Sequence, residues 1–444
     1  MLYIADFHIH SKYSRATSRS LDLENIDLWC RKKGINICGT GDFTHPKWLA
    51  EIKEKLEEAG NGLLRLKNLE FRIKNLEEKI PPTPFNKGGN KYIYFILTTE
   101  ISCIYKQGGK TRRIHLIILA PTILAVEKIN EQLEKRGCNL KSDGRPIVGL
   151  SAKEVAKIVF DASPDCMVIP AHAWTPWFSV FGSKSGFDTI EECFEELAPQ
   201  IYAIETGLSS DPAMNWRLSK LDKITLISNS DAHSPENLGR EANVFSINPS
   251  TSSGQALNLY QEITRILKEK DTEKFLYTIE FFPEEGKYHF DGHATCKISL
   301  SPEETKKNKG ICPVCRKPLV IGVLNRVEEL ADRPEGEQPI NLIPYKSLVP
   351  LREIIAEAMD QGRATKRVVA EYEKLIAQGE SEFNILLNLD YEDLKKITLP
   401  EIVEGIKRVR EGKLIIAPGY DGVYGTVKIF SEQEKKKNRQ ERLL

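Results

Sequence analysis

Leu2-Tyr3-Ile4-Ala5-Asp6-Phe7-His8-Ile9-His10 joins a short apolar strand to two histidines in alternating positions. Side chains at positions i and i+2 of a strand point to the same face, so the imidazoles of His8 and His10 can reach one ion, and Asp6 lies on that face too. The same spacing recurs in Asp231-Ala232-His233, which follows another candidate strand. These segments therefore predict a metal site at the ends of strands.

Residues 1–245 alternate short apolar strands with helical stretches. This alternation is typical of a parallel α/β architecture, either a barrel or a doubly wound sheet. The expected strands are Tyr3–His8, Asn36–Gly39, Tyr92–Thr98, Ile114–Ala120, Cys166–Pro170, Ile201–Glu205 and Ile224–Ser228. Helices are expected between them, such as Leu23–Lys33, Pro46–Ala59 and Ala152–Phe160. The proline- and glycine-rich stretch Pro81–Gly89 predicts an exposed loop that interrupts the alternation.

Further ionisable side chains fall at or near the expected strands, several at their carboxyl ends: Asp42, Glu100, His115 and His172. In a parallel α/β fold this is the edge where catalytic groups gather. A single histidine beside a strand is usually a hydrogen-bonded core residue, but burying the whole set together without an ion would be costly. Imidazole mixed with carboxylate suits zinc, manganese or iron better than calcium.

These motifs resemble a known superfamily. Asp6–His10, Gly39–Asp42, Thr99-Glu100, His115, Pro170–His172 and Ser230–His233 are similar, in order and spacing, to the motifs of the polymerase and histidinol phosphatase (PHP) superfamily. The resemblance implies a distorted seven-stranded (β/α) barrel with a multinuclear metal site at its mouth.

The resemblance also assigns the ligands. It implies that one ion is held by His8, His10, Glu100 and Asp231, a second by Glu100, His115 and His172, and a third by Asp42 and His233. His8, Glu100 and Asp231 are accordingly the expected catalytic residues. The sequence departs from the superfamily at the third ion, because Phe43 follows Asp42 where a histidine is usual.

Three of the nine cysteines lie close together in His293-x2-Cys296-x15-Cys312-x2-Cys315. Two pairs of ligands joined by a loop can close a tetrahedron, so this spacing predicts a structural zinc ribbon. His289 is an alternative to His293 as the fourth ligand, and a reduced Cys-x2-Cys or a redox dithiol is the competing interpretation. The other six cysteines are scattered, mostly among apolar residues, and are expected to be reduced.

The chain divides by composition into five parts. We expect the barrel over residues 1–245, a connector with one helix and one strand over 246–285, the zinc ribbon over 286–324, a mainly helical region ending in a short hairpin over 325–430, and a charged tail over 431–444. The hairpin is predicted from strands Leu414–Pro418 and Val423–Phe430 around the turn Gly419-Tyr420-Asp421-Gly422.

This order of parts resembles the endonuclease Q family. The segments that carry the resemblance are Thr98–Glu100, Pro176–Phe178, Phe181–Ser183, Ser228–His233, Arg326–Arg333 and Pro418–Gly422. The resemblance implies a DNA repair endonuclease that cuts double- or single-stranded DNA 5′ of uracil, hypoxanthine, xanthine or an abasic site. It also implies two or three divalent ions (zinc, manganese or magnesium) at the active site, beside one structural zinc.

A nuclease specific for damaged bases has to inspect a base, usually by flipping it into a pocket. The candidates for base or backbone contacts are Trp174, Trp177, Phe178, Lys184 and Arg240. The aromatic residues can stack on a base and the basic ones can contact phosphates, against the alternatives of loop packing and solvated charge. Because a metal group cannot distinguish uracil from thymine, we expect a pocket formed jointly by barrel loops and the C-terminal region.

The composition of the chain limits the classes of function that it can have. With 63 basic and 63 acidic residues the chain is not a bulk polycation, although a local basic groove remains possible. A hydrophobic content of 41% and no long apolar run or secretory signal predict a soluble cytoplasmic protein. Two other functions stay open, a small-molecule phosphoesterase of the histidinol phosphatase type and a DNA-binding protein with an inactive metal site.

Overall fold

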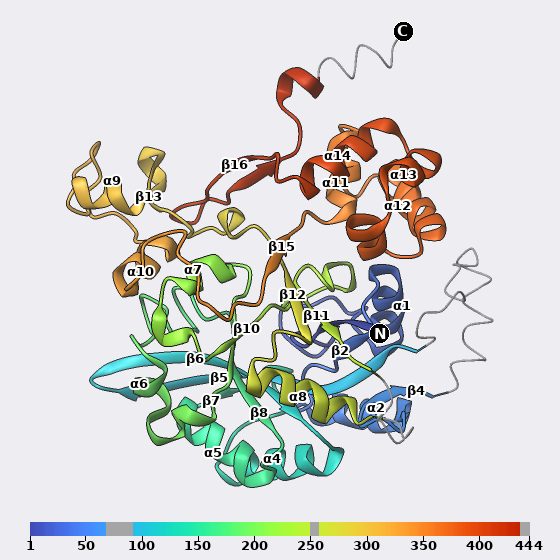
Figure 1. Ribbon diagram of the computed structural model, residues 1–444. Helices are drawn as coiled ribbons and strands as arrows, with labels where there is room; N and C mark the ends of the chain where they lie inside the picture. Colours follow the sequence, from blue (N-terminus) through green and yellow to red (C-terminus); the bar gives the residue numbers. More distant parts are fainter. Residues whose placement is uncertain (68–91, 249–256, 436–444) are drawn as a thin grey trace.

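The computed structural model describes residues 1–67, 92–248 and 257–435 (Figure 1). Its body is a mixed α/β unit built on an 11-stranded sheet. The strands of this sheet are β1 (Leu2–Asp6), β2 (Ile37–Gly39), β3 (Leu56–Glu58), β4 (Leu64–Leu66), β5 (Tyr94–Gln107), β6 (Lys110–Ala120), β7 (Ile147–Val148), β8 (Met167–Pro170), β11 (Ala242–Ser246), β12 (Phe275–Glu280) and β15 (Tyr345–Ser347). Neighbours follow the order β15-β12-β11-β1-β2-β5-β4-β3, with β6 and β7 paired to β5 and β8 paired to β6.

All seven expected strands form, as β1, β2, β5, β6, β8, β9 (Ala203–Glu205) and β10 (Thr225–Ile227). The β1–β2, β2–β5 and β9–β10 pairs are parallel, and an isolated parallel bridge joins Ile9 to Ala232. A wholly parallel alternation is nevertheless wrong, because β6 runs antiparallel to both β5 and β8. The reason is local: Gly108 and Gly109 have φ values of +59° and +73°, which close a tight hairpin and leave no room for a crossover helix.

The same hairpin lengthens two strands beyond the sequence prediction. The strand expected to end at Thr98 continues to Gln107, paired along its length with β6. Glu100 therefore lies inside a strand, where its side chain points in a fixed direction, and not at a strand end. His115 lies inside β6, opposite Ser102 of β5.

Helices pack against the sheet: α1 (Leu23–Lys33), α2 (Pro46–Lys55), α4 (Ile123–Lys135), α5 (Ala152–Ala162), α6 (Ile190–Phe194), α7 (Pro212–Trp216) and α8 (Leu259–Glu269). Helix α1 has the predicted bounds, because the Asp22 side chain caps its first turn and Gly34 ends it with a φ of +89°. The helix expected over Pro46–Ala59 is shorter, since Leu56–Glu58 pairs with β4 instead. The loop predicted over Pro81–Gly89 and most of the charged tail lie outside the described residues.

The boundary expected at residue 245 is not a structural boundary. The strand and helix expected in the connector are present as β12 and α8, but β12 pairs antiparallel with β11 and parallel with β15. Segments on both sides of residue 245 therefore complete one sheet.

Two smaller parts stand beside each other above the sheet body in Figure 1. One holds β13 (Asp291–His293), β14 (Ile298–Leu300), α9 (Pro302–Lys307) and α10 (Val323–Leu330), and the other holds α11 (Leu351–Ala358), α12 (Lys366–Gly379), α13 (Tyr391–Ile397) and α14 (Pro400–Arg410). The predicted hairpin forms as β16 (Ile415–Ala417) and β17 (Thr426–Lys428), which lie between the two parts. Its second strand begins at Thr426 and not at Val423, so residues 418–425 connect the two strands. No helix within the described ranges is long and apolar enough to cross a membrane.

Candidate metal centre

Four of the predicted ligands converge at the ends of β1 and β10 and on β5. One ligand atom from each of His8, His10, Glu100 and Asp231 lies within 4.8 Å of the others. Glu100 Oε2 is 3.6 Å from His8 Nε2 and 3.4 Å from His10 Nε2, and Asp231 Oδ1 is 3.0 Å from His10 Nε2. The Nε2 atom of His8 is buried and has no hydrogen-bond partner. Because an unpaired buried nitrogen is costly, this atom is suited to coordinate an ion.

A second group shares Glu100. Its other oxygen, Oε1, lies 2.6 Å from His115 Nδ1 and 3.1 Å from His172 Nε2. One carboxylate thus presents one oxygen to each group, which is the arrangement that can bridge two ions. The structure therefore brings together six predicted ligands in two adjoining groups, with Glu100 shared between them.

Each of the four histidines uses its second ring nitrogen for a polar partner outside the ligand groups. Such partners fix the orientation of a metal-binding imidazole and raise its basicity. The pairs are His8 Nδ1 with Glu205 Oε1 (3.0 Å), His10 Nδ1 with Asp42 Oδ1 (3.1 Å), His115 Nε2 with Ser102 Oγ (3.0 Å) and His172 Nδ1 with Thr175 Oγ1 (3.2 Å). This repeated pattern leaves the ligand nitrogens facing inward.

The electrostatics favour cations at this place. Burial alone lowers the pKa of His8, but the carboxylates of Glu205, Asp231 and Glu100 outweigh it and raise that pKa well above its usual value. Burial raises the pKa of Glu100, yet His115, Arg145 and His8 outweigh it and hold that pKa well below the usual range. The carboxylate of Glu100 therefore stays ionised at neutral pH and can attract metal ions.

The pair expected to serve a third ion is not brought together as a ligand group. Oδ1 of Asp42 contacts His10, and its Oδ2 accepts hydrogen bonds from Ser11 and Ser14, so this carboxylate holds the imidazole of His10 in position. His233 lies beside the first group, with Nδ1 2.8 Å from the backbone oxygen of Asp231, but it belongs to neither group. The missing histidine after Asp42 agrees with this arrangement.

A mouth of about 500 Å³ opens over the ligands and is lined by His115, His172 and Asp231 together with Arg15, Asp143 and Arg145. Arg145 donates to Glu100 Oε2 at 3.0 Å. Asp143 positions the backbone of Arg15 and Arg145, since its Oδ1 accepts hydrogen bonds from both backbone N–H groups. Neither Arg145 nor Glu205 was identified from the sequence; only the position of Glu205 at the end of a predicted strand pointed to it.

The residues expected to contact a base separate into three locations. Trp174 is fully buried, where its Nε1 donates to Asn215 and its ring packs on Phe181, so the prediction that it contacts a base is wrong. Arg240 lines a small cavity between α1 and the helical part, away from the mouth, and Lys184 is exposed on the surface. Trp177 and Phe178 do line the mouth, and the Trp177 side chain is 37% exposed.

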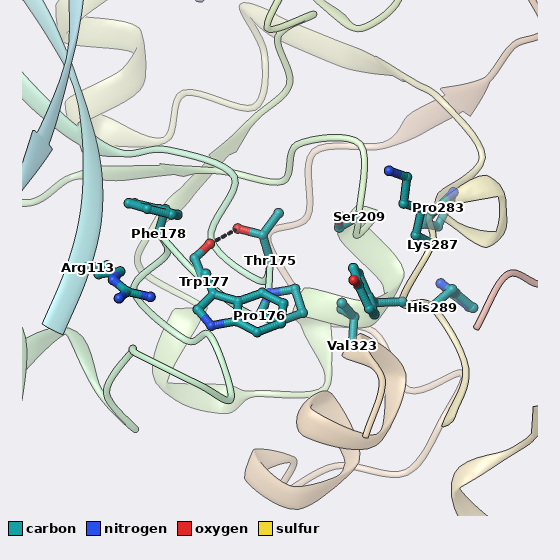
Figure 2. Close-up of a pocket in the computed structure, with 12 residues that line it drawn as sticks. Arg113, Thr175, Pro176, Trp177, Phe178, Ser209, Pro283, Lys287, His289 and Val323 are labelled. Carbon is teal, nitrogen blue, oxygen red and sulfur yellow. Dashed lines mark hydrogen bonds between the residues drawn. The ribbon is translucent and has the colours of Figure 1, made fainter. Parts of the chain in front are cut away.

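Trp177 and Phe178 also line a second pocket of about 460 Å³ (Figure 2). The loop after β8 forms one wall, and residues 283–289 with Val323 form the other. The Trp177 and Tyr288 rings meet edge to face with centroids 5.9 Å apart, and Thr175, Trp177, Phe178 and Ser209 line both this pocket and the mouth. We call this second pocket the aromatic pocket.

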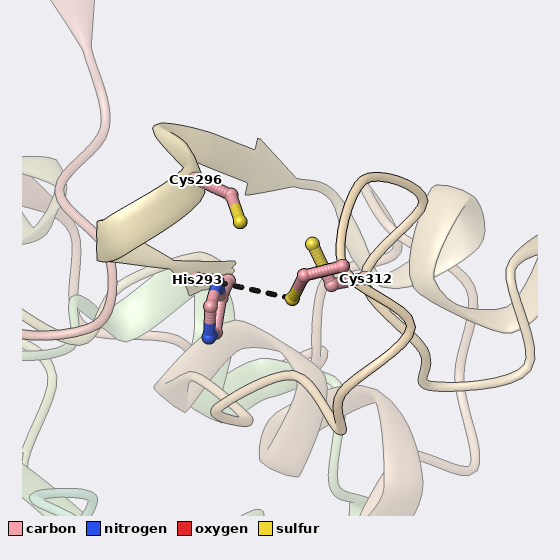
Figure 3. A group of neighbouring side chains, drawn as sticks. His293, Cys296 and Cys312 are labelled. Atoms are coloured by element: carbon pink, nitrogen blue, oxygen red, sulfur yellow. Dashed lines mark hydrogen bonds between the residues drawn. The ribbon is translucent and has the colours of Figure 1, made fainter.

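The cysteine module gathers the four predicted zinc ligands (Figure 3). One ligand atom from each of His293, Cys296, Cys312 and Cys315 lies within 4.8 Å of the others, and Cys315 Sγ is 3.7 Å from His293 Nδ1. His289, the alternative fourth ligand, is not in this group but lines the aromatic pocket. Three thiols and one imidazole at this spacing suit tetrahedral zinc.

Two curated proteins are similar in sequence. Uncharacterized protein MJ0043 of Methanocaldococcus jannaschii is 34% identical over 272 residues, which is 61% of this chain but 33% of that protein, so the match spans about a third of that relative. Uncharacterized protein YqxK of Bacillus subtilis is 26% identical over 96% of this chain and 98% of its own length. Residues 350–413, which hold α11 to α14, match the family model of the MJ0043 C-terminal domain.

Two solved structures are similar over nearly the whole chain. The lesion-specific endonuclease PfuEndoQ from Pyrococcus furiosus superposes with a TM-score of 0.79 and 28% identity, covering 98% of this chain and 97% of that one. Endonuclease Q in complex with a 27-mer duplex substrate, with an abasic lesion at its active site, gives a TM-score of 0.78 and 29% identity, covering 97% and 98%. From the sheet body through the cysteine module to the helical C-terminal part, this chain is similar in structure to endonuclease Q.

Proposed function

We propose that this protein is a metal-dependent DNA endonuclease that cuts the strand 5′ of deaminated bases (uracil, hypoxanthine or xanthine) or abasic sites, and that its sheet body is a distorted PHP barrel. The observation that carries the proposal is the carboxylate of Glu100, which faces one ligand group with each oxygen. Two adjacent cation sites can stabilise both the attacking and the leaving oxygen in phosphodiester hydrolysis. The structural similarity to endonuclease Q supports DNA as the substrate class.

Two ions, zinc, manganese or magnesium, would be held by the two ligand groups and would supply Lewis acidity and an activated water. The protein's own groups do the rest. Arg145 and Arg15 place guanidinium groups at the mouth, where they can bind the non-bridging oxygens of a phosphate. Glu205 and Asp42 hold His8 and His10 in position.

The aromatic pocket is the proposed recognition site for an extruded base. It adjoins the mouth, so a base in it and a phosphate over the ligands can belong to one nucleotide or its neighbour. Its walls come from the loop after β8 and from segment 283–289, which supports a pocket formed jointly by the barrel and later regions. Trp177 and Tyr288 offer faces for stacking.

The cysteine module is proposed to hold one structural zinc through His293, Cys296, Cys312 and Cys315. A zinc bound there contributes folding free energy to a module with few buried apolar residues. It would thereby fix the segment that carries one wall of the aromatic pocket.

The test is cleavage of end-labelled DNA duplexes that carry uracil, hypoxanthine, xanthine, an abasic site or no lesion. Metal-free protein is supplemented with Mg²⁺, Mn²⁺ or Zn²⁺, and Asp231→Asn and His8→Ala serve as matched inactive variants. We expect cuts 5′ of the lesion that depend on metal and are lost in both variants, while DNA affinity, which comes mainly from phosphate contacts, is retained.

Two results would contradict the proposal. Hydrolysis of p-nitrophenyl phosphate without cleavage of any damaged duplex would indicate a small-molecule phosphoesterase. Binding of damaged DNA without cleavage in all three metals would indicate a DNA-binding protein with an inactive centre.

A further inference from the structure

The turn between β16 and β17 exposes an aromatic and an aliphatic side chain. Tyr420-Asp421-Gly422-Val423 forms a tight turn in which Asp421 and Gly422 have φ values of +42° and +85°, the backbone that an Asp-Gly pair favours. Val423, the last residue of this turn, is 40% exposed, and Tyr424, which follows it, is 68% exposed. Two consecutive apolar side chains are therefore exposed at the end of this turn.

This turn is rigidly held. Its backbone donates three hydrogen bonds to segment 284–287, from Gly419 to Glu284 O (2.8 Å), from Gly422 to Lys287 O (3.0 Å) and from Gly425 to Glu285 O (3.1 Å). The Asp421 carboxylate accepts from the backbone of Ala294 at 2.6 Å. A Cβ atom at Gly425 would lie 2.0 Å from Glu284 O, so the two backbones are in direct contact. Because the backbone around Tyr424 is held in place, little conformational entropy is lost when its ring contacts another molecule.

The support is the same segment that forms one wall of the aromatic pocket. Lys287 lines that pocket, and its Nζ lies 4.6 Å from the centroid of the Tyr424 ring. Lys287 thus lies between the Tyr424 ring and the aromatic pocket. It therefore places a positive charge between the two, where it can contact a phosphate.

We propose that Tyr424, with Val423 beside it, is a wedge that enters the base stack of the duplex next to the extruded base. The inference rests on the proposed nuclease function and adds to it the residues that open the duplex. Removing a base from a stack leaves a gap, and an apolar or aromatic side chain that fills the gap offsets part of the cost of unstacking. Lys287 would hold the adjoining phosphate while the ring is inserted.

The test compares duplex and single-stranded DNA that carry the same uracil. A wedge matters only where a stack has to be opened, so Tyr424→Ala should slow single-turnover cleavage of the duplex about 10-fold or more, the size of a lost aromatic stacking contact, and change cleavage of the single strand less than about twofold. Tyr424→Phe should restore most of the duplex rate. Leu124→Ala, at an exposed apolar residue (60%) on α4, is the matched control and should leave both rates unchanged.

A second measurement reports base extrusion without cleavage. In the Asp231→Asn background, 2-aminopurine placed next to the uracil should brighten on binding, and adding Tyr424→Ala should remove most of that rise. Equal loss of cleavage on duplex and single strand, or a duplex rate for Tyr424→Ala equal to that of the wild type, would overturn the wedge. The nuclease proposal is judged separately, by whether the wild-type protein cuts either substrate.

Discussion

Glu205 serves both ligand groups, so Glu205→Gln should weaken metal binding while leaving every proposed ligand in place. Its Oε1 lies 3.0 Å from His8 Nδ1, and its Oε2 accepts from the backbone N–H of His172 at 2.7 Å. The substitution keeps the shape of the side chain but replaces an ionised acceptor with a neutral amide. A hydrogen bond to an ionised group is worth about 1 to 1.5 kcal/mol more than a neutral one, so affinity for the ion should fall roughly 10-fold.

The assay is a calorimetric titration of metal-free protein with Mn²⁺ or Zn²⁺, paired with cleavage rate as a function of metal concentration. Glu205→Gln should need about 10-fold more metal for half-maximal cleavage, and its saturated rate should stay close to that of the wild type. Asp211→Asn is the matched control, because Asp211 is a half-buried carboxylate outside both ligand groups that caps α7 by accepting from Met214 N. Identical metal dependence for Glu205→Gln and the wild type would refute the argument that Glu205 strengthens metal binding by His8.

Three further predictions follow from other parts of the structure. Cys312→Ser and His293→Ala should each release about one zinc by elemental analysis, whereas His289→Ala should release none; retention of zinc in the first two variants would exclude the proposed ligand set. Arg145→Ala should lower the cleavage rate about 100-fold with little change in DNA affinity, as expected for one lost electrostatic contact to the reacting phosphate, and an unchanged rate would remove Arg145 from the centre. Burial, with Asp211 nearby, raises the pKa of Glu280 from 4.5 to about 8. At neutral pH its carboxyl is therefore protonated in the folded protein but ionised in the unfolded chain. The stability that it contributes is fully present below pH 4.5 and is lost as the pH rises to 8. At about 1.4 kcal/mol per pKa unit the loss between pH 4.5 and 8 is at most roughly 5 kcal/mol, so Glu280→Gln should flatten the fall in unfolding free energy over this range, measured by urea denaturation; parallel curves would contradict this.

Local patterns determined the chemistry of this protein. The alternation in Asp6–His10 fixed two imidazoles on one face, and the spacing of His293, Cys296, Cys312 and Cys315 is short enough for each pair to belong to one turn. Alternation of apolar strands with helices gave the seven central strands, and the Asp-Gly pair at Asp421 gave the hairpin. These features depend on neighbours a few residues away, which is the range over which backbone geometry is set by sequence.

The tertiary structure alone decided which polar groups meet. Glu205 and His8 are 197 residues apart in the chain, and Arg145 reaches Glu100 from a loop that carries no recognisable motif. The roles of Asp42 and Trp174 also depended on the fold, because a carboxylate beside a histidine can bind the ion or the imidazole, and an indole after a strand can face a pocket or the core. The direction of β6 and the shared sheet across residue 245 arise from strand pairing, which joins segments distant in the sequence. Such choices are made by packing and burial among residues brought together from far along the chain, and no local pattern encodes them.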